Sequence, residues 1–237
     1  MKVAIHQPQY WPWPRYIHKI MSADLFVYLD TVQFSKNGVQ NRNQIKTNRG
    51  PLWLTVPVKQ RLGQTILETR LADATATEKH WKTLKANYSS APGYDRWKDE
   101  LQSLLQQPWH SLCDAAIDST EWLLDKLSVG VERVRASELE GVNGQSSELI
   151  GSICRHVGAT TYLTGEGALA YLELKDFSAA GCDVWLQDWK GLQYTQTFPA
   201  AGFLPDLSTL DLLLNCPVDA GDLIRGAGGW TLIPGQA

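Results

Sequence analysis

The beginning of the chain alternates between apolar runs and segments with a regular apolar period. Residues 2–5 and 25–29 are short apolar runs typical of buried strands, and residues 15–22 between them have a helical pattern. Pro12 and Pro14 fit a loop that enters this helix, because proline is favoured at the first helical position. A strand, a helix and a second buried strand form a βαβ unit, so we expect the fold to begin with parallel strands.

The middle of the chain has two further patterns. Residues 39–46, 52–58 and 65–71 alternate like strands, and Asn37-Gly38 is a strong hairpin signal, so an antiparallel excursion from the first unit is predicted. Residues 76–127 have apolar stripes at helical spacing. We expect this part to be a helical insertion or subdomain with helices at residues 77–88, 93–107 and 111–127.

The remainder returns to alternating strands and helices. The pattern predicts, in turn, a strand, a helix, a strand, a helix and a strand at residues 129–136, 146–157, 160–163, 175–180 and 182–187. A last helix is predicted at residues 206–215, and the Gly-rich residues 226–237 are expected to be frayed. The chain as a whole therefore predicts a single α/β domain over residues 1–237 with a central, mostly parallel sheet.

Composition narrows the classes of protein that fit this pattern. The net charge of −3 gives no general reason to expect a nucleic acid or an anionic membrane as partner, and no apolar run is long enough to insert into a membrane. Met1-Lys2 leads directly into a strand, which argues against a secretory signal. The four cysteines lie far apart in the sequence, which favours reduced thiols and a cytoplasmic location.

The connection between the first two strands concentrates polar and aromatic side chains. In open parallel sheets, ligands bind beyond the carboxyl ends of the strands, where this connection begins. His6 ends the first strand, and His18 and Lys19 lie on the following helix, whose N-terminus favours an anion such as phosphate. The alternative is that His6 forms a hydrogen bond in the core and His18 lies on the surface. Further binding candidates in this connection are Gln7, Gln9, Tyr10, Trp13 and Arg15.

A polar strand follows at residues 40–46. Arg42 is a natural fork for a carboxylate or a phosphate, and Asn41 and Asn43, on the other strand face, could orient a polar ligand. The alternative is a solvated edge strand, because buried amides need hydrogen-bond partners. The sequence leaves both possibilities open.

Two more segments follow buried strands and should lie at the same sheet edge. Asp30 and Gln33 come after the second strand, and Glu166 lies between Gly165 and Gly167 after a later one. The glycines allow the backbone to approach a ligand closely, although a plain tight turn explains them equally well. A metal site made by His6, His18 and Asp30 is conceivable, but no spacing requires it and we expect none.

Several long motifs resemble the WbqC-like family. They are "HQPQYWPW…Y.HK", "AD.FVYLD.VQFSK", "QNRNQIKT..GP.WLTVPV", "YLTGEGALAYL" and "FLPDLSTLDLL". The family is found among genes for bacterial surface polysaccharides, around amino-sugar modification, so this resemblance implies a biosynthetic setting. The chain departs from the family at Pro14-Arg15, where a glycine usually precedes the helix; Arg15 could supply a cation instead. A looser layout likeness is to the HxGH-type nucleotidyltransferase-like fold, which would bring His6 and His18 near ATP.

These features together suggest an enzyme that joins an activated carboxylate, such as that of an amino acid, to an amine such as an amino sugar. ATP with Mg²⁺ would activate the acid as an acyl-adenylate, with His6, His18 and Lys19 stabilising the phosphates. Arg42 would hold the carboxylate, and Glu166 or Asp30 would bind the amine or accept its proton. One alternative is an acyl or aminoacyl transferase whose donor is a carrier-protein thioester or an aminoacyl-tRNA. Another is a non-catalytic sugar- or nucleotide-binding protein.

Overall fold

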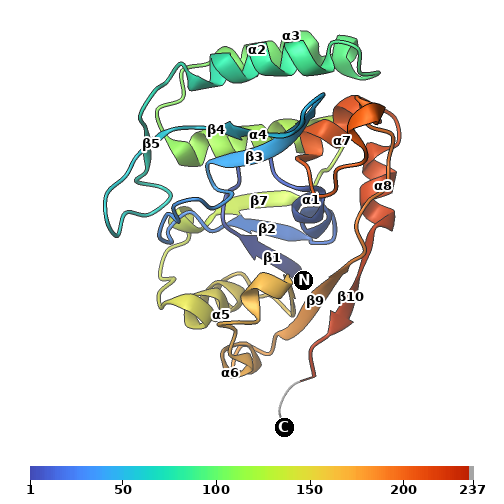
Figure 1. Cartoon of the computed structure of the whole chain (residues 1–237). Coiled ribbons are helices and arrows are strands. Elements are labelled where there is room, and N and C mark those ends of the chain that lie inside the picture. Colours follow the sequence, from blue (N-terminus) through green and yellow to red (C-terminus); the bar gives the residue numbers. More distant parts are fainter. Residues whose placement is uncertain (235–237) are drawn as a thin grey trace.

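A six-stranded sheet forms the centre of the computed structural model, which describes residues 1–234 (Figure 1). Its strand order is β10-β9-β8-β1-β2-β7. The strands are β1 (Lys2–His6), β2 (Leu25–Tyr28), β7 (Glu132–Arg135), β8 (Thr161–Thr164), β9 (Asp183–Trp189) and β10 (Gly228–Leu232). All neighbouring pairs are parallel except β9 with β10, so the predicted mostly parallel sheet is confirmed.

The order of the strands determines where a ligand can bind. The chain builds the sheet outwards from β1, first through β2 to β7 and then through β8 to β9 and β10. β1 therefore pairs with β2 on one side and with β8 on the other. The direction of building reverses between β1 and β8, and in doubly wound sheets the binding crevice lies at the carboxyl ends of such a pair. The likeness to the HxGH-type fold stays a prediction, because this order occurs in several α/β folds.

Helices cover both faces of the sheet because its strands are apolar on both sides. Val3 and Ile5 pack into one buried cluster, whereas Ala4 between them packs into the other. α5 (Ser146–His156) and α6 (Leu174–Ser178) cover the first face. The other face is covered by α1 (Pro14–Met21), α4 (Leu112–Lys126), α7 (Thr209–Asn215) and α8 (Ala220–Gly226) (Figure 1). Among residues 1–234, no helix combines the length and apolarity that crossing a membrane requires.

The antiparallel excursion and the helical segment lie above the second face (Figure 1). The excursion contains β3 (Arg42–Thr47), β4 (Gly50–Thr55), β5 (Val58–Lys59) and β6 (Arg70–Leu71), followed by α2 (Ala76–Tyr88) and α3 (Tyr94–Gln106). The described residues also form three short 3-10 turns: η1 (Ala136–Glu138), η2 (Glu166–Ala168) and η3 (Pro199–Ala201). The prediction of a strand at residues 65–71 was wrong for most of its length, because Ile66 and Leu67 donate hydrogen bonds to the loop after β2 instead of to a strand.

The expectation of a frayed end at residues 226–237 was also wrong for most of the segment that the structure describes. β10 pairs with residues 185–189 of β9, and its Trp230 stacks on His18 at a ring distance of 5.8 Å. Gly228 is required for this approach, since a Cβ there would lie 3.1 Å from both the Asp188 carbonyl oxygen and the His18 ring. Gly228 thus allows close packing here. Residues 235–237 lie outside the described part.

Candidate functional site

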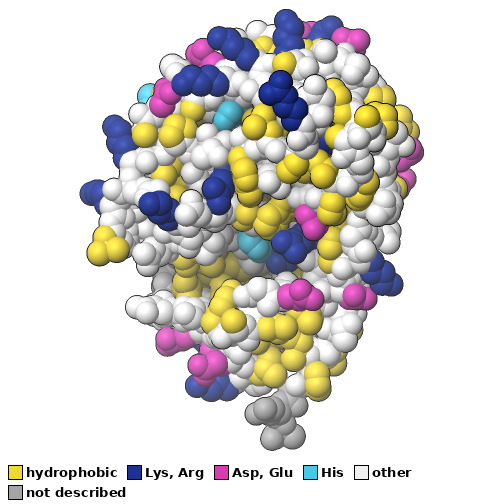
Figure 2. Space-filling view, viewed as in Figure 1, with side chains coloured by type: hydrophobic (Ala, Val, Ile, Leu, Met, Phe, Trp, Pro, Cys, Tyr) yellow, Lys and Arg dark blue, Asp and Glu magenta, His cyan; other side chains and the backbone are white. Residues whose placement is uncertain are grey.

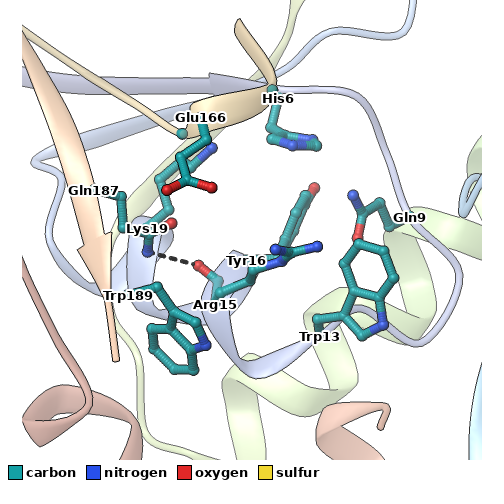
Figure 3. Close-up of a pocket in the computed structure, with 11 residues that line it drawn as sticks. His6, Gln9, Trp13, Arg15, Tyr16, Lys19, Glu166, Gln187 and Trp189 are labelled. Atoms are coloured by element: carbon teal, nitrogen blue, oxygen red, sulfur yellow. Dashed lines mark hydrogen bonds between the residues drawn. The ribbon is translucent and has the colours of Figure 1, made fainter. Parts of the chain in front are cut away.

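A cleft with a volume of about 470 Å³ opens at the carboxyl ends of β1 and β8. We call it the polar cleft. Eight of the residues predicted from the sequence line it: His6, Gln9, Trp13, Arg15, Lys19, Gly165, Glu166 and Gly167. The remaining lining residues are Tyr16, Gln187 and Trp189 (Figure 3). In the space-filling view, a histidine lies beside a lysine or arginine in the hollow between the upper and lower parts of the molecule (Figure 2).

The side chains that line the polar cleft come from the ends of strands and from one face of α1. His6 is the last residue of β1, and Glu166 opens the turn that follows β8. Arg15 and Lys19 are four residues apart on α1 and therefore lie on one helix face, with Tyr16 beside them. The cleft is thus bounded by the ends of the three strands β1, β8 and β9 and by one helix, and its charge comes mainly from that helix.

His6 is held in its neutral form. Its Nδ1 lies 3.0 Å from the Gln7 carbonyl oxygen, and its ring meets Tyr16 edge-to-face with 4.9 Å between the ring centroids. Burial, with a further effect from the Lys19 charge, lowers the pKa of His6 to about 3. A carbonyl oxygen only accepts, so Nδ1 carries the hydrogen and Nε2 is left as an acceptor.

Lys19 is a buried cation without a protein partner. The residue is 5% exposed, and no hydrogen bond or salt bridge joins its ammonium to any residue within 1–234. Burial, followed by the charge of Arg15, lowers the pKa of Lys19 to about 8. A Cβ on Gly165 would lie only 3.3 Å from Nζ, so this glycine leaves the space in front of the ammonium open. A buried cation of this kind is stabilised when an anion binds.

Two further polar atoms of the cleft lack partners. The Tyr16 hydroxyl and the Gln9 Oε1 are buried and form no hydrogen bond with any of the residues that the structure describes. Burial, with an added effect from Glu121, raises the pKa of Tyr16 well above its usual value, so its hydroxyl keeps its proton and can donate. Figure 3 shows this hydroxyl pointing toward His6. Unpaired buried groups are costly, and at a cleft these two are available to form hydrogen bonds with a ligand.

Aromatic rings form the side walls. The Arg15 guanidinium lies 4.4 Å from the centre of the Trp13 ring, a cation–π contact that leaves the charge at the cleft. Gln187 donates through Nε2 to the Arg15 carbonyl oxygen at 2.9 Å (Figure 3, dashed line). The same nitrogen lies 2.9 Å from His18 Nδ1. His18 itself lies behind Gln187, stacked on β10, and does not line the polar cleft.

The N-terminus of α1 offers fewer free backbone N–H groups to an anion than the sequence suggests. Pro14 has no N–H, and the N–H of Tyr16 already donates to the Trp13 carbonyl oxygen at 3.0 Å. The positive charge of the site therefore comes from the side chains of Lys19 and Arg15. The sequence analysis singled out Arg15 as a possible cation at the start of this helix, and the structure brings it to the cleft.

The polar side chains of the β3 region lie elsewhere. Asn41 and Asn43 are buried and donate to backbone carbonyl oxygens at 2.8 and 2.7 Å, and Arg42 donates to another at 2.6 Å. Tyr10 is fully buried, with its hydroxyl 2.9 Å from His80 Nδ1. None of the four predicted residues lines the polar cleft. Their amides and hydroxyl hold the hairpin and the first connection together.

Asp30 does not line the polar cleft and turns instead towards Ser137, which follows β7. It is fully buried and accepts hydrogen bonds from the Ser137 backbone N–H at 3.0 Å and the Ser137 hydroxyl at 2.6 Å. It is not near His6 and His18 as a metal site would need, and within residues 1–234 no three metal-ligating side chains are grouped. Gln7 and Gln33 line neighbouring cavities.

Replacing Asp30 by alanine should lower stability without changing ligand affinity. Two donors of Ser137 would lose a buried carboxylate, which costs about 3 kcal/mol. Urea unfolding measures this cost. Asp95→Ala is the control, because Asp95 is exposed and a carboxylate in a surface ion pair contributes less than about 1 kcal/mol. Lost ligand affinity in a stably folded Asp30→Ala protein would instead support the predicted role in substrate binding.

Three lining residues were missed by the sequence argument. Gln187 and Trp189 lie at the carboxyl end of β9, so the rule applied to the other strands would have selected them. Tyr16 has the apolar spacing of a core residue, and it is 2% exposed. Only the lack of a hydroxyl partner distinguishes it from scaffold.

Comparisons with known proteins identify the family of the chain. The profile of the WbqC-like protein family matches residues 7–223. The Uncharacterized protein Rv1507c of Mycobacterium tuberculosis is 32% identical over 230 residues, which cover 94% of this chain and 97% of that protein. No solved structure shows significant similarity to this chain. The chain belongs to the WbqC-like protein family.

Proposed function

We propose that the polar cleft binds the anionic part of a small-molecule substrate and that the protein catalyses amide formation between an acyl group and an amine. The observation that carries this proposal is that three groups without a side-chain partner among residues 1–234 converge on one cleft: the Lys19 ammonium, the Tyr16 hydroxyl and the Gln9 amide oxygen. A cation and a hydroxyl donor suit a carboxylate or phosphate, and the Gln9 oxygen accepts from a donor such as an amine.

In the ATP-dependent form, a carboxylate oxygen attacks the α-phosphorus of ATP and pyrophosphate leaves. The amine nitrogen then attacks the acyl carbon, the bond from this carbon to the AMP oxygen breaks, and the amine loses a proton. Lys19 and Arg15 would hold the negative charge that develops on the phosphate, and the Tyr16 hydroxyl would donate to the oxyanion. Glu166, exposed at the rim, would bind the amine and take its proton. ATP with Mg²⁺ enters here as co-substrate.

The alternative form uses a preactivated donor, such as a thioester on a carrier protein or an aminoacyl-tRNA. The amine attacks the same acyl carbon, and a thiolate or the tRNA hydroxyl leaves in place of AMP. Lys19 and Tyr16 keep their roles, because negative charge develops on the carbonyl oxygen in both reactions. The family resemblance, with its amino-sugar setting, favours an amino sugar as the amine in either form.

The test is product formation with each donor. The purified protein is incubated with amino acids and amino sugars, with ATP and Mg²⁺ in one series and an acyl thioester in the other. Mass spectrometry identifies the amide, and release of AMP or free thiol reports the route. Absence of any amide together with unchanged binding of phosphate by the Lys19→Met variant would refute the proposal.

The His6→Ala variant distinguishes an enzyme from a non-catalytic binding protein. If the Nε2 of His6 interacts with the reacting groups, kcat should fall by about 100-fold while substrate affinity changes little, because the contact strengthens in the transition state. A binding protein would form no product and would show only a modest loss of affinity. Tryptophan fluorescence reports binding in both cases, since Trp13 and Trp189 line the cleft.

A further inference from the structure

A second cavity system adjoins the polar cleft. It consists of two cavities with volumes of about 280 and 530 Å³, which we together call the uncharged trough. The smaller cavity shares a wall with the polar cleft, formed by His6, Lys19, Gly165 and Gly167. The two cavities of the trough have in common the residues Gln7, Leu29, Ile150 and Tyr171. The trough therefore begins at the buried ammonium and leads away from it toward α5.

The lining of the trough differs in charge from that of the polar cleft. Away from the shared wall, none of the described residues that line it is charged, whereas the polar cleft holds Arg15 and Glu166 in addition to Lys19. Its hydrogen-bonding groups are neutral amides and hydroxyls, from Gln7, Thr31, Gln33, Gln145, Ser146 and Thr164. Such a set satisfies hydroxyl and amide groups of a ligand and offers nothing to offset a charge.

Two residues give the trough definite contacts. The Gln7 Oε1 accepts a hydrogen bond from Gln40 Nε2 at 2.6 Å, so the Gln7 amide is fixed with its NH₂ group left as donor. Tyr171 is 49% exposed although it lines both cavities, so its ring offers an open aromatic surface. An aromatic face beside amide donors is a common arrangement for binding neutral polar rings or chains.

We propose that the uncharged trough is the subsite for a neutral, hydroxyl- or amide-rich group of the second substrate, whose reacting atom reaches the wall formed by Lys19 and Gly165. The inference rests on the proposed function, since joining two substrates requires two subsites that meet at one point. The wall lies at the carboxyl ends of β1 and β8, where the strand order reverses. A sugar ring and the pantetheine arm of a thioester donor share the required chemistry.

The experiment titrates ¹⁵N-labelled protein with three probes: N-acetylglucosamine, pantetheine and inorganic phosphate. NMR amide shifts give both the location and the affinity of each probe. Tyr171→Ala should weaken binding of the neutral probe by about 5-fold, because an aromatic contact is lost, and leave phosphate binding unchanged. Arg15→Ala should have the opposite effects. Leu169→Ala is the matched control, because Leu169 is 48% exposed and lies outside both sites.

The outcomes separate the two proposals. Binding of N-acetylglucosamine identifies a sugar subsite, and binding of pantetheine identifies a donor arm; either supports the inference. If neither neutral probe shifts the Gln7 or Tyr171 amides, or if Tyr171→Ala leaves their affinity unchanged, the inference is wrong even when phosphate binds at Lys19. If phosphate binding is insensitive to Arg15→Ala and Lys19→Met while a neutral probe binds the trough, the anion site of the proposed function fails instead.

Discussion

Replacing Lys19 by methionine is expected to make the protein more stable and to remove most of its affinity for anions. The ammonium is buried without a counter-ion in the described part of the chain, and its pKa is lowered from 10.5 to about 8. A shift of this size corresponds to about 3 kcal/mol of destabilisation below pH 8, which the apolar methionine relieves. Loss of the charge costs about 1.5–3 kcal/mol of anion binding, or about 10- to 100-fold in affinity.

Chemical denaturation and phosphate titration measure the two effects in one variant. Lys36→Met is the control, because this lysine is exposed and lies outside the polar cleft, so neither quantity should change by more than about 0.5 kcal/mol. Opposite signs for stability and affinity are expected of a residue kept for binding at a cost to folding. A destabilised variant that still binds phosphate would show that Lys19 is a structural residue.

The sequence predicts the fold well where local patterns decide it. The apolar runs of β1 and β2 with a helix between them allow few arrangements, because a crossover between parallel strands is long and nearly always has one handedness. β10 could not be predicted in this way. Its glycines are typical of a loop. Its pairing depends on the free edge of β9 and on the close approach of His18, and both exist only once the sheet has formed.

The sequence predicts only part of the candidate site, because it shows where residues lie along strands but not which partners they contact. Residues directly after strands, such as His6 and Glu166, are placed by the geometry of a parallel sheet, which the pattern reveals. The sequence does not reveal which polar side chains are already satisfied within the protein. Asn43 and Asp30 look like binding residues until their partners are seen, and Tyr16 looks like core until its hydroxyl is found without one.

The affinity for an anion should fall as the pH rises through about 8, with no inflection near the usual pKa of histidine. Binding needs the Lys19 ammonium, whose pKa of about 8 in the free protein makes affinity drop about tenfold for each further pH unit. His6, with its pKa lowered to about 3, stays neutral over this whole range. Sulfate is the probe, because it does not titrate there, and calorimetry between about pH 6 and about pH 10 gives the profile.

Two further measurements test whether Lys19 is the group that causes this pH profile. Lys19→Arg should bind sulfate with a flat profile up to about pH 10, because a guanidinium does not lose its proton in this range.

The stability of the native protein should change with pH in the opposite direction to its anion affinity. Between about pH 8 and pH 10.5 the unfolded chain still holds the Lys19 proton that the folded protein has lost, so this residue makes unfolding less favourable as pH rises. The difference in unfolding free energy between the native protein and Lys19→Met should therefore shrink across that window. A constant difference, or a falling profile in Lys19→Arg, would assign the titration to another group.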